Sequence, residues 1–103
     1  MVIQSERVWI AGQFIPAQLE VKDGQIERIY NYGERAADAD YGCKRIVPGF
    51  IDIHTHGAYG FDTNDAEPEG LRSWMKRIPE EGVTSILPTT VTQMPDVLTA
   101  AVA

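Results

Sequence analysis

The chain has 103 residues, of which 44% are hydrophobic and 23% are charged, a composition that is ordinary for one small globular domain. Its formal net charge of −6 argues against nucleic acid or an anionic membrane as the main partner, because both attract basic patches. No apolar run approaches the roughly 18 residues of a membrane span, and the lone Cys43 excludes an intrachain disulfide. We therefore expect a cytoplasmic protein in which Cys43 is a small, buried packing residue.

The first part of the chain predicts short antiparallel strands. Alternation of apolar and polar residues is typical of a half-buried strand, and Asp23-Gly24 is a strong hairpin signal because glycine tolerates a positive φ. Ala11-Gly12 indicates another turn. The expected strands are Glu6 to Ile10, Gln13 to Ile15, Ala17 to Val21, Gln25 to Tyr30 and, after a polar loop over residues 31–42, Lys44 to Val47.

The second part of the chain changes character after Pro48-Gly49. Phe50 to His56 is a nearly continuous apolar run ended by Gly57, which is typical of a strand buried on both faces in a parallel sheet. A helix is expected to begin at Pro68, which suits the first helical turn, and to end near Pro79 and Gly82. Its apolar stripe consists of Leu71, Trp74, Met75 and Ile78.

A second strand, Val83 to Leu87, and a second helix opened by Pro95 complete a strand–helix–strand–helix order. This order predicts an α/β fold. The second helix has no glycine, basic last turn or following breaker before Ala103. We therefore expect the chain to be the N-terminal part of a longer protein.

Both histidines of the chain lie at the end of the first apolar strand. Residues i and i+2 of a strand share a face, so His54 and His56 point the same way with Cβ atoms roughly 6–7 Å apart. Two such imidazoles can bind one divalent metal ion. Asp52 lies on the same face and is a candidate to accept a ring N–H of a ligating histidine.

Two histidines do not complete a catalytic metal site, which usually needs three protein ligands and an open position. No further histidine is present, so another ligand would be a carboxylate or would lie beyond Ala103. The cluster Asp62, Asn64 and Asp65 is not a calcium loop, because Ala66 breaks that pattern. We interpret the cluster as a structural turn near the mouth of the site.

The stretch PGFIDIHTHG, Pro48 to Gly57, resembles the first-strand metal motif of the amidohydrolase superfamily. The continuation is similar to the N-acetylglucosamine-6-phosphate deacetylases within it. In that family a Gly-x-x-Gly segment follows the first strand, as in Gly57 to Gly60 here, and a second strand resembles GVTSILPTT, Gly82 to Thr90. The resemblance covers essentially the whole chain and is most specific from Pro48 to Gln93.

The resemblance implies a (β/α)8 metal-dependent hydrolase barrel preceded by part of a small β-sandwich domain. Residues 1–47 would be N-terminal strands of the sandwich, and residues 48–103 would be the first β/α units of the barrel, cut in the second helix. The implied reaction removes the acetyl group of N-acetylglucosamine 6-phosphate. His54 and His56 match the family's metal pair. The resemblance places no catalytic or substrate-binding residue in this chain.

The same resemblance implies one or two divalent metal ions, chosen among Zn, Fe, Mn and Co, a phosphosugar substrate, and a homodimer for the full-length enzyme. The 103-residue chain alone should be inactive and should aggregate through unpaired strands. Two alternatives stay open. One is another amidohydrolase that resembles a dihydroorotase, hydantoinase or deaminase, and the other is a small domain without catalytic activity.

Overall fold

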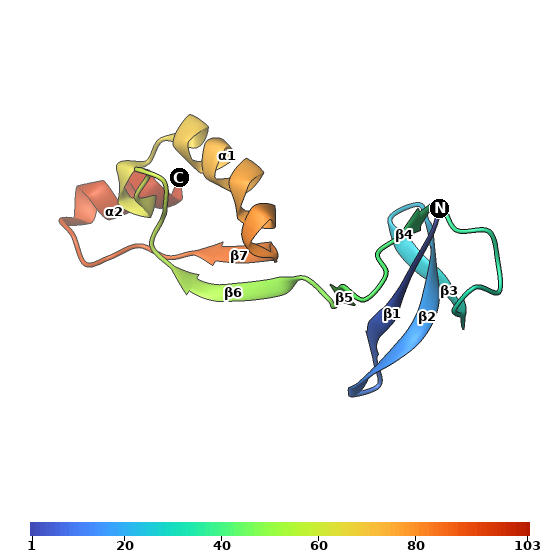
Figure 1. The fold of residues 1–103 in the computed structure, drawn as a ribbon. Coiled ribbons are helices and arrows are strands. Elements are labelled where there is room, and N and C mark those ends of the chain that lie inside the picture. Colours follow the sequence, from blue (N-terminus) through green and yellow to red (C-terminus); the bar gives the residue numbers. More distant parts are fainter. The chain divides into compact units, whose positions relative to one another are not determined.

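The computed structural model describes residues 1–103, which form two compact units, Met1–Pro48 and Gly49–Ala103. The first unit is built of strands and the second of strands and helices (Figure 1). The strands are β1 Val2–Ile10, β2 Gln13–Lys22, β3 Gln25–Asn31, β4 Ala39–Asp40, β5 Arg45–Ile46, β6 Phe50–Thr55 and β7 Val83–Pro88. The helices are α1 Pro68–Arg77 and α2 Pro95–Val102, with 3₁₀ turns η1 Thr63–Asp65 and η2 Ile78–Glu81. No helix has the length and apolar character that crossing a membrane requires.

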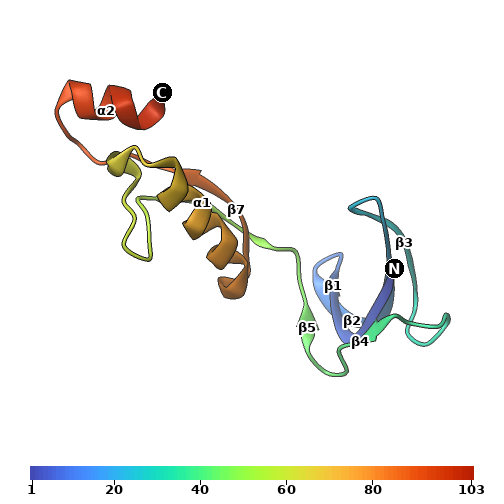
Figure 2. The ribbon, with the colours of Figure 1, turned by 90° about the horizontal axis from the view of Figure 1, so that it is seen from above.

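The first unit is a five-stranded sheet in the order β3-β2-β1-β4, with β5 also paired to β1. The two predicted hairpin turns are confirmed: Asp23 and Gly24 have φ values of 50° and 76°, and Ala11 and Gly12 behave alike. Figure 2 shows β1, β2 and β3 as a curved antiparallel sheet. The core consists of Val8, Ala17 and Leu19.

The expected strand boundaries in this unit are wrong at several points. β1 begins at Val2, and β2 runs through Pro16 without a break. Proline is tolerated there because the register between β1 and β2 shifts between Ser5 and Val8, so no ladder hydrogen bond is needed from it. The segment expected to be a loop contains β4, which pairs in parallel with β1. Cys43, expected to be buried, is exposed.

Gln18 is a polar residue of β2 that is completely buried. Segment 32–38 covers it. The Gln18 side chain donates to the Arg35 carbonyl oxygen at 2.8 Å and accepts from the Arg35 N–H at 2.9 Å. It also donates to the Gln4 side chain at 2.6 Å. A buried amide satisfied in this way holds the loop against the sheet.

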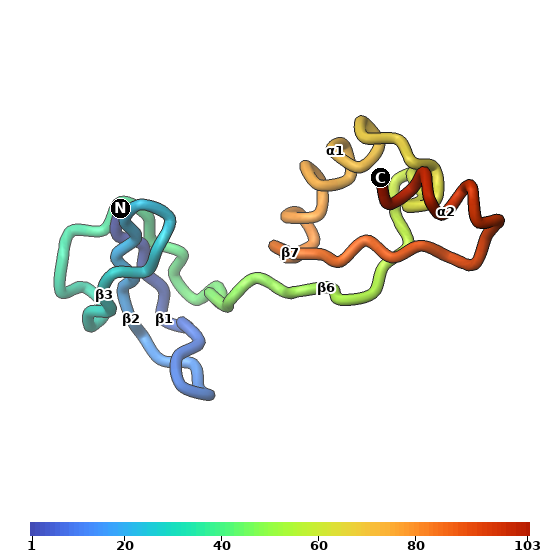
Figure 3. The backbone as a smooth tube through the Cα atoms, turned by 180° about the vertical axis from the view of Figure 1, so that it is seen from behind, coloured from blue at the N-terminus to red at the C-terminus, as the bar shows by residue number.

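The second unit contains a two-stranded parallel sheet, β6-β7, with α1 between the strands in sequence. Figures 1 and 3 show the two strands side by side from opposite directions, with α1 on one face of the pair. The predicted apolar stripe of α1 is confirmed, since Trp74 and Ile78 are only 3% and 6% exposed. α1 gives way to η2 at Pro79, and η2 is followed by Gly82 at a φ of 81°, as the sequence predicted.

The expectation that the first apolar strand is buried on both faces is wrong for this structure. Ile51 and Ile53 of β6 are 67% and 70% exposed. The physical reason is that β7 is the only strand paired with β6. The parallel pairing that the apolar run predicted is nevertheless present.

Candidate functional site

The candidate site lies where β6 and β7 end. In a parallel pair the carboxyl ends of both strands meet at the same edge of the sheet, so residues that follow the two strands become neighbours. Here the Thr89 N–H donates to the Thr55 carbonyl oxygen at 2.8 Å, directly after β7. The residues brought together at this edge are His54, His56 and the segment that begins at Thr89.

The two imidazoles lie side by side, as their spacing in the sequence predicted. The ring centroids of His54 and His56 are 4.9 Å apart and the ring planes are 78° from parallel. Both side chains are exposed. Two adjacent, accessible imidazoles can approach one ion at metal–nitrogen distances of about 2.0–2.1 Å.

His56 is oriented by a backbone group on the neighbouring loop. Its Nδ1 lies 2.8 Å from the Thr89 carbonyl oxygen. A carbonyl oxygen can only accept a hydrogen bond, so the neutral ring carries its proton on Nδ1. The lone pair of Nε2 is then available, which is the state required of a metal ligand. The sequence could not reveal this contact, because every residue has a backbone carbonyl.

Asp52 contacts the backbone of His54 in this structure. Its carboxylate accepts a hydrogen bond from the backbone N–H of His54 at 3.1 Å, and the ring hydrogen bond of the site is made by Thr89 instead. Asp52 therefore fixes the backbone at the end of β6 in this structure. A hydrogen bond from a histidine ring to Asp52 stays a prediction.

His54 and His56 can supply some, but not all, of the ligands that a divalent metal ion needs. The structure contains no group of three or more histidine, cysteine, aspartate or glutamate side chains arranged to hold a metal ion. His54 and His56 can supply two nitrogen ligands, one with its free nitrogen set by the Thr89 contact. A four-coordinate catalytic site needs one more protein ligand and an open position.

The loop after β6 is shaped by glycine and by its own carboxylates. Gly57 has a φ of 137° and lies so close to the Phe61 carbonyl oxygen that a Cβ atom would meet it at 2.1 Å. The Asp62 carboxylate then caps η1 by accepting from the Asn64 N–H at 2.8 Å, and the Asp65 carboxylate accepts from the Asp62 N–H at 2.9 Å. This capping box agrees with a structural turn for these acidic residues.

Tyr59 fastens the same loop to the end of α1. The guanidinium carbon of Arg77 lies 3.7 Å from the centre of the Tyr59 ring, and the Tyr59 hydroxyl donates to the Glu81 carboxylate. This hydrogen bond, with the negative charge of Glu81, raises the pKa of Tyr59 above its ordinary value of 10.0. Tyr59 is therefore neutral at physiological pH and acts as an anchor of the loop.

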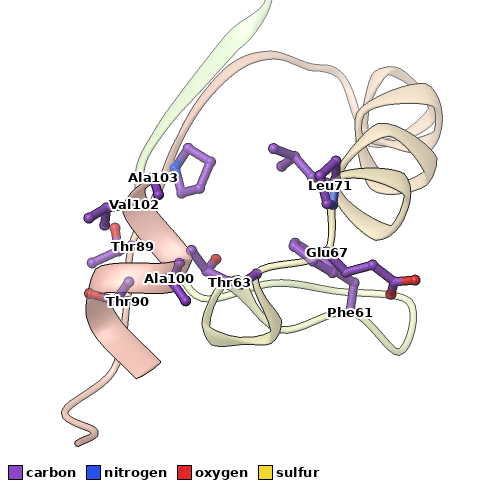
Figure 4. A pocket seen from close by; sticks show the side chains of 13 residues that line it. Phe61, Thr63, Glu67, Leu71, Thr89, Thr90, Ala100, Val102 and Ala103 are labelled. Atoms are coloured by element: carbon purple, nitrogen blue, oxygen red, sulfur yellow. The ribbon is translucent and has the colours of Figure 1, made fainter. Parts of the chain in front are cut away.

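A hollow of about 580 Å³ lies beside the site but does not include the two histidines. Its walls come from the start of α1, the segment after β7 and the end of α2 (Figure 4). Leu71 and Phe61 line it from one direction, and Ala100 and Val102 from another. The lining is mostly apolar, and Glu67 is its one charged side chain.

Comparison with known proteins places these features in a family. The profile of the amidohydrolase family matches residues 45–103, which is more than half of the chain. The chain is 56% identical to the N-acetylglucosamine-6-phosphate deacetylase of Bacillus subtilis (strain 168) over 48 residues, covering 47% of this chain and 12% of that protein. It is 34% identical to the human protein of the same name over 99 residues, covering 88% of this chain and 24% of that one.

The fold agrees with solved structures. The N-acetyl-D-glucosamine-6-phosphate deacetylase of Mycobacterium smegmatis superimposes on 99% of this chain and 30% of its own, with a TM-score of 0.89 at 24% sequence identity. A mutant of that enzyme, in complex with N-acetyl-D-glucosamine-6-phosphate, matches equally well. The chain thus spans between 12% and 24% of the length of these two curated relatives. From the profile match over its second unit, we conclude that the chain belongs to the amidohydrolase family.

Proposed function

We propose that the protein carrying this chain is a metal-dependent N-acetylglucosamine-6-phosphate deacetylase, which hydrolyses the N-acetyl amide to give glucosamine 6-phosphate and acetate. The observation that carries the proposal is the 56% identity to the Bacillus subtilis deacetylase over 48 residues. The adjacent imidazoles of His54 and His56 support it. A shared family alone would leave the substrate open.

Within this proposal, residues 1–47 are strands of a small β-sandwich domain and residues 48–103 are the first β/α units of a (β/α)8 barrel. The parallel pairing of β6 and β7, with α1 between them in sequence, supports the second assignment. In such barrels the active site lies at the carboxyl ends of the strands. His54 lies at that end of β6, and His56 directly follows the strand.

The proposed reaction has two difficulties, because an amide is a poor electrophile and neutral water is a poor nucleophile. The chemistry that a divalent metal supplies when bound is a lowered pKa of its water and polarisation of the amide carbonyl. His54 and His56 would hold the ion, and the Thr89 carbonyl keeps the His56 ring in its ligating form. No acid or base that transfers the proton is assigned to residues 1–103.

The proposal extends to the metal, the assembly and the compartment. Imidazole ligands suit Zn, Fe, Mn or Co, with one or two ions bound. A homodimer follows from the resemblance to the deacetylases, and light scattering of the whole protein tests it. The exposed, free Cys43 suits the reducing environment of the cytoplasm.

The test is acetate release by the whole, metal-loaded protein. We expect turnover of N-acetylglucosamine 6-phosphate, with much weaker turnover of unphosphorylated N-acetylglucosamine. We expect His54→Ala and His56→Ala each to lower kcat/KM at least about a hundredfold, because loss of a ligand should exceed the 10–100-fold cost of losing its hydrogen-bond partner. Gln25→Ala, at an exposed position in the other unit, is the matched control and should leave the rate unchanged.

The outcomes separate the alternatives. Hydrolysis of a cyclic amide or deamination of a nucleobase, with no acetate released from the phosphosugar, would assign the protein to another branch of the family. Full activity in both histidine variants would remove the metal pair from the mechanism. A protein that binds no metal and hydrolyses none of these compounds would be a domain without catalytic activity.

A further inference from the structure

Two loops meet beside His56, and one side chain joins them. The Asn64 amide of η1 makes a pair of hydrogen bonds with the backbone of Val91, in the segment after β7. Its Nδ2 donates to the Val91 carbonyl oxygen at 3.0 Å, and its Oδ1 accepts from the Val91 N–H at 3.0 Å. Among uncharged side chains, only amides offer a donor and an acceptor side by side in this way.

The same two loops contact His56 on either side of this pair. The Thr63 N–H and hydroxyl both donate to the His56 carbonyl oxygen, at 2.7 Å and 2.9 Å. The His56 ring in turn contacts the Thr89 carbonyl oxygen. Hydrogen bonds and chain connectivity therefore form a closed loop. It runs from His56 through Thr63 and Asn64 to Val91, and returns through Thr89 to the His56 ring.

Asn64 is not needed to build its own turn. The capping hydrogen bonds of η1 are made by the carboxylates of Asp62 and Asp65, and only the backbone N–H of Asn64 takes part. Its side chain is directed instead to a segment 27 residues away along the chain. The amide therefore has a role outside the turn, and the structure identifies the held segment as the one that orients His56.

We propose that Asn64 is a positioning residue that acts through Thr89. By holding Val91, it fixes the Thr89 carbonyl where it keeps the proton of the neutral His56 ring on Nδ1, so that Nε2 is free as the ligand atom. Its relevance to metal binding rests on the proposed function. The placement of the proton is a property of the chain itself and can be measured without metal.

The test uses the whole protein labelled with ¹⁵N-histidine, first free of metal and at alkaline pH. Two-bond ¹H–¹⁵N correlation spectra distinguish a ring protonated on Nδ1 from one protonated on Nε2, and His56→Ala identifies the signals of His56. The variants are Asn64→Ala and Asn64→Asp, where aspartate still accepts from the Val91 N–H but cannot donate to its carbonyl. Asn31→Ala is the matched control, because it removes the same amide from the other unit, where that amide bonds only to nearby Glu34.

In the wild type and in Asn31→Ala we expect the His56 ring to be protonated on Nδ1. In Asn64→Ala we expect a mixture of both tautomers, with Asn64→Asp between the two. In a zinc titration against a chelating dye, Asn64→Ala should raise the Kd by up to about tenfold, the lower bound for loss of a direct hydrogen-bond partner of a ligand. The far-ultraviolet circular dichroism should stay at the wild-type value.

A wild-type tautomer signal in Asn64→Ala overturns the proposal, whatever the stability of the variant. If Asn64→Ala does not fold, a wild-type tautomer signal in Asn64→Asp overturns it equally. The zinc titration separates this inference from the proposed function. Equal zinc affinity of wild type and His56→Ala would refute the metal pair, while the tautomer signals would still decide the role of Asn64.

Discussion

At the scale of single residues, the site depends on chemistry that a sequence shows only in part. The spacing of His54 and His56 predicted that the imidazoles would meet, because alternation along a strand is a fixed geometric property. The partner of His56 could not be predicted, since it is the backbone carbonyl of Thr89. The hydrogen bonds between Asn64 and Val91 could not be predicted either, because no sequence pattern indicates which loop a polar loop residue will contact.

Gly57 is the residue on which the loop after His56 depends most. A Cβ atom there would lie 2.1 Å from the Phe61 carbonyl oxygen, and its φ of 137° is unfavourable for any side chain. We expect Gly57→Ala to lower the free energy of unfolding by about 2–4 kcal/mol, from backbone strain and overpacking together. Urea denaturation of the wild type and the variant measures the difference.

Gly60 provides the control for this prediction. It also has a positive φ, 84°, but a Cβ atom there meets nothing within 4 Å. Gly60→Ala should therefore cost only the backbone strain, about 1–2 kcal/mol. Equal losses in the two variants would mean that the close approach of Gly57 to Phe61 contributes nothing.

At the scale of elements, helices and turns with a regular residue pattern were predicted well, but the burial of side chains beneath loops was not. The apolar stripe and the breaking residues of α1 were read correctly because they are local properties of ten or so residues. The burial of Gln18 could not be predicted, because it depends on hydrogen bonds between its side chain and the backbone of Arg35 in a loop that has no repeating pattern. β4 was missed for the same reason, since two residues carry no period.

Trp74 anchors α1, and the exposed Trp9 serves as its control. The Trp74 side chain is 3% exposed and packs 6.0 Å from the centre of the Phe61 ring. We expect Trp74→Ala to lower the free energy of unfolding of its unit by about 3–5 kcal/mol, the usual cost of a buried aromatic cavity. Trp9, 43% exposed on β1, should cost only about 1 kcal/mol when replaced by alanine. A similar loss at both positions in thermal denaturation would contradict this account of α1.

The first unit should lose stability in acid through Asp40 of β4. The Gly42 N–H, the Gln4 amide and the Tyr32 hydroxyl all donate to its carboxylate, which lowers the pKa of Asp40 below its ordinary value of 3.8. A carboxyl whose pKa is lowered by folding stabilises the protein above its unfolded pKa, and the contribution disappears as the pH falls through the folded pKa.

The measurement for Asp40 is the urea midpoint at about pH 6 and about pH 3, which lie above and below the ordinary aspartate pKa of 3.8. We expect the midpoint of the wild type to fall more than that of Asp40→Asn, because asparagine does not titrate. Asp96→Asn, at an exposed position on α2, should behave like the wild type. A midpoint whose fall is unaffected by Asp40→Asn would show that these three hydrogen bonds do not favour the charged form.

At the scale of the whole molecule, the sequence predicted the class of fold because the order of strands and helices is itself the signal. The structure superimposes on that of the mycobacterial deacetylase over 99% of the chain. Burial of β6 on both faces was not observed, because burial depends on neighbours and the sheet contains only β6 and β7. An apolar run shows that a strand is suited to burial, but neighbouring elements decide whether the strand is buried.

The exposed apolar side chains of β6 and β7 predict self-association of the 103-residue chain. Phe50, Ile51 and Ile53 are more than 60% exposed, and Leu87 is 59% exposed. Such patches associate or bind hydrophobic dyes. We expect the apparent mass in analytical ultracentrifugation to rise with concentration, and less so in Ile51→Lys. A chain that stays monomeric across the concentration range would contradict this expectation.

The most direct test of the account is the metal content of the whole protein, measured by elemental mass spectrometry after dialysis. We expect the wild type to retain a divalent transition metal. The double variant His54→Ala/His56→Ala should lose at least one ion per chain, and Gln25→Ala should lose none. Equal metal content in the wild type and the double variant would contradict the central claim, that these two histidines hold the metal of an amidohydrolase site.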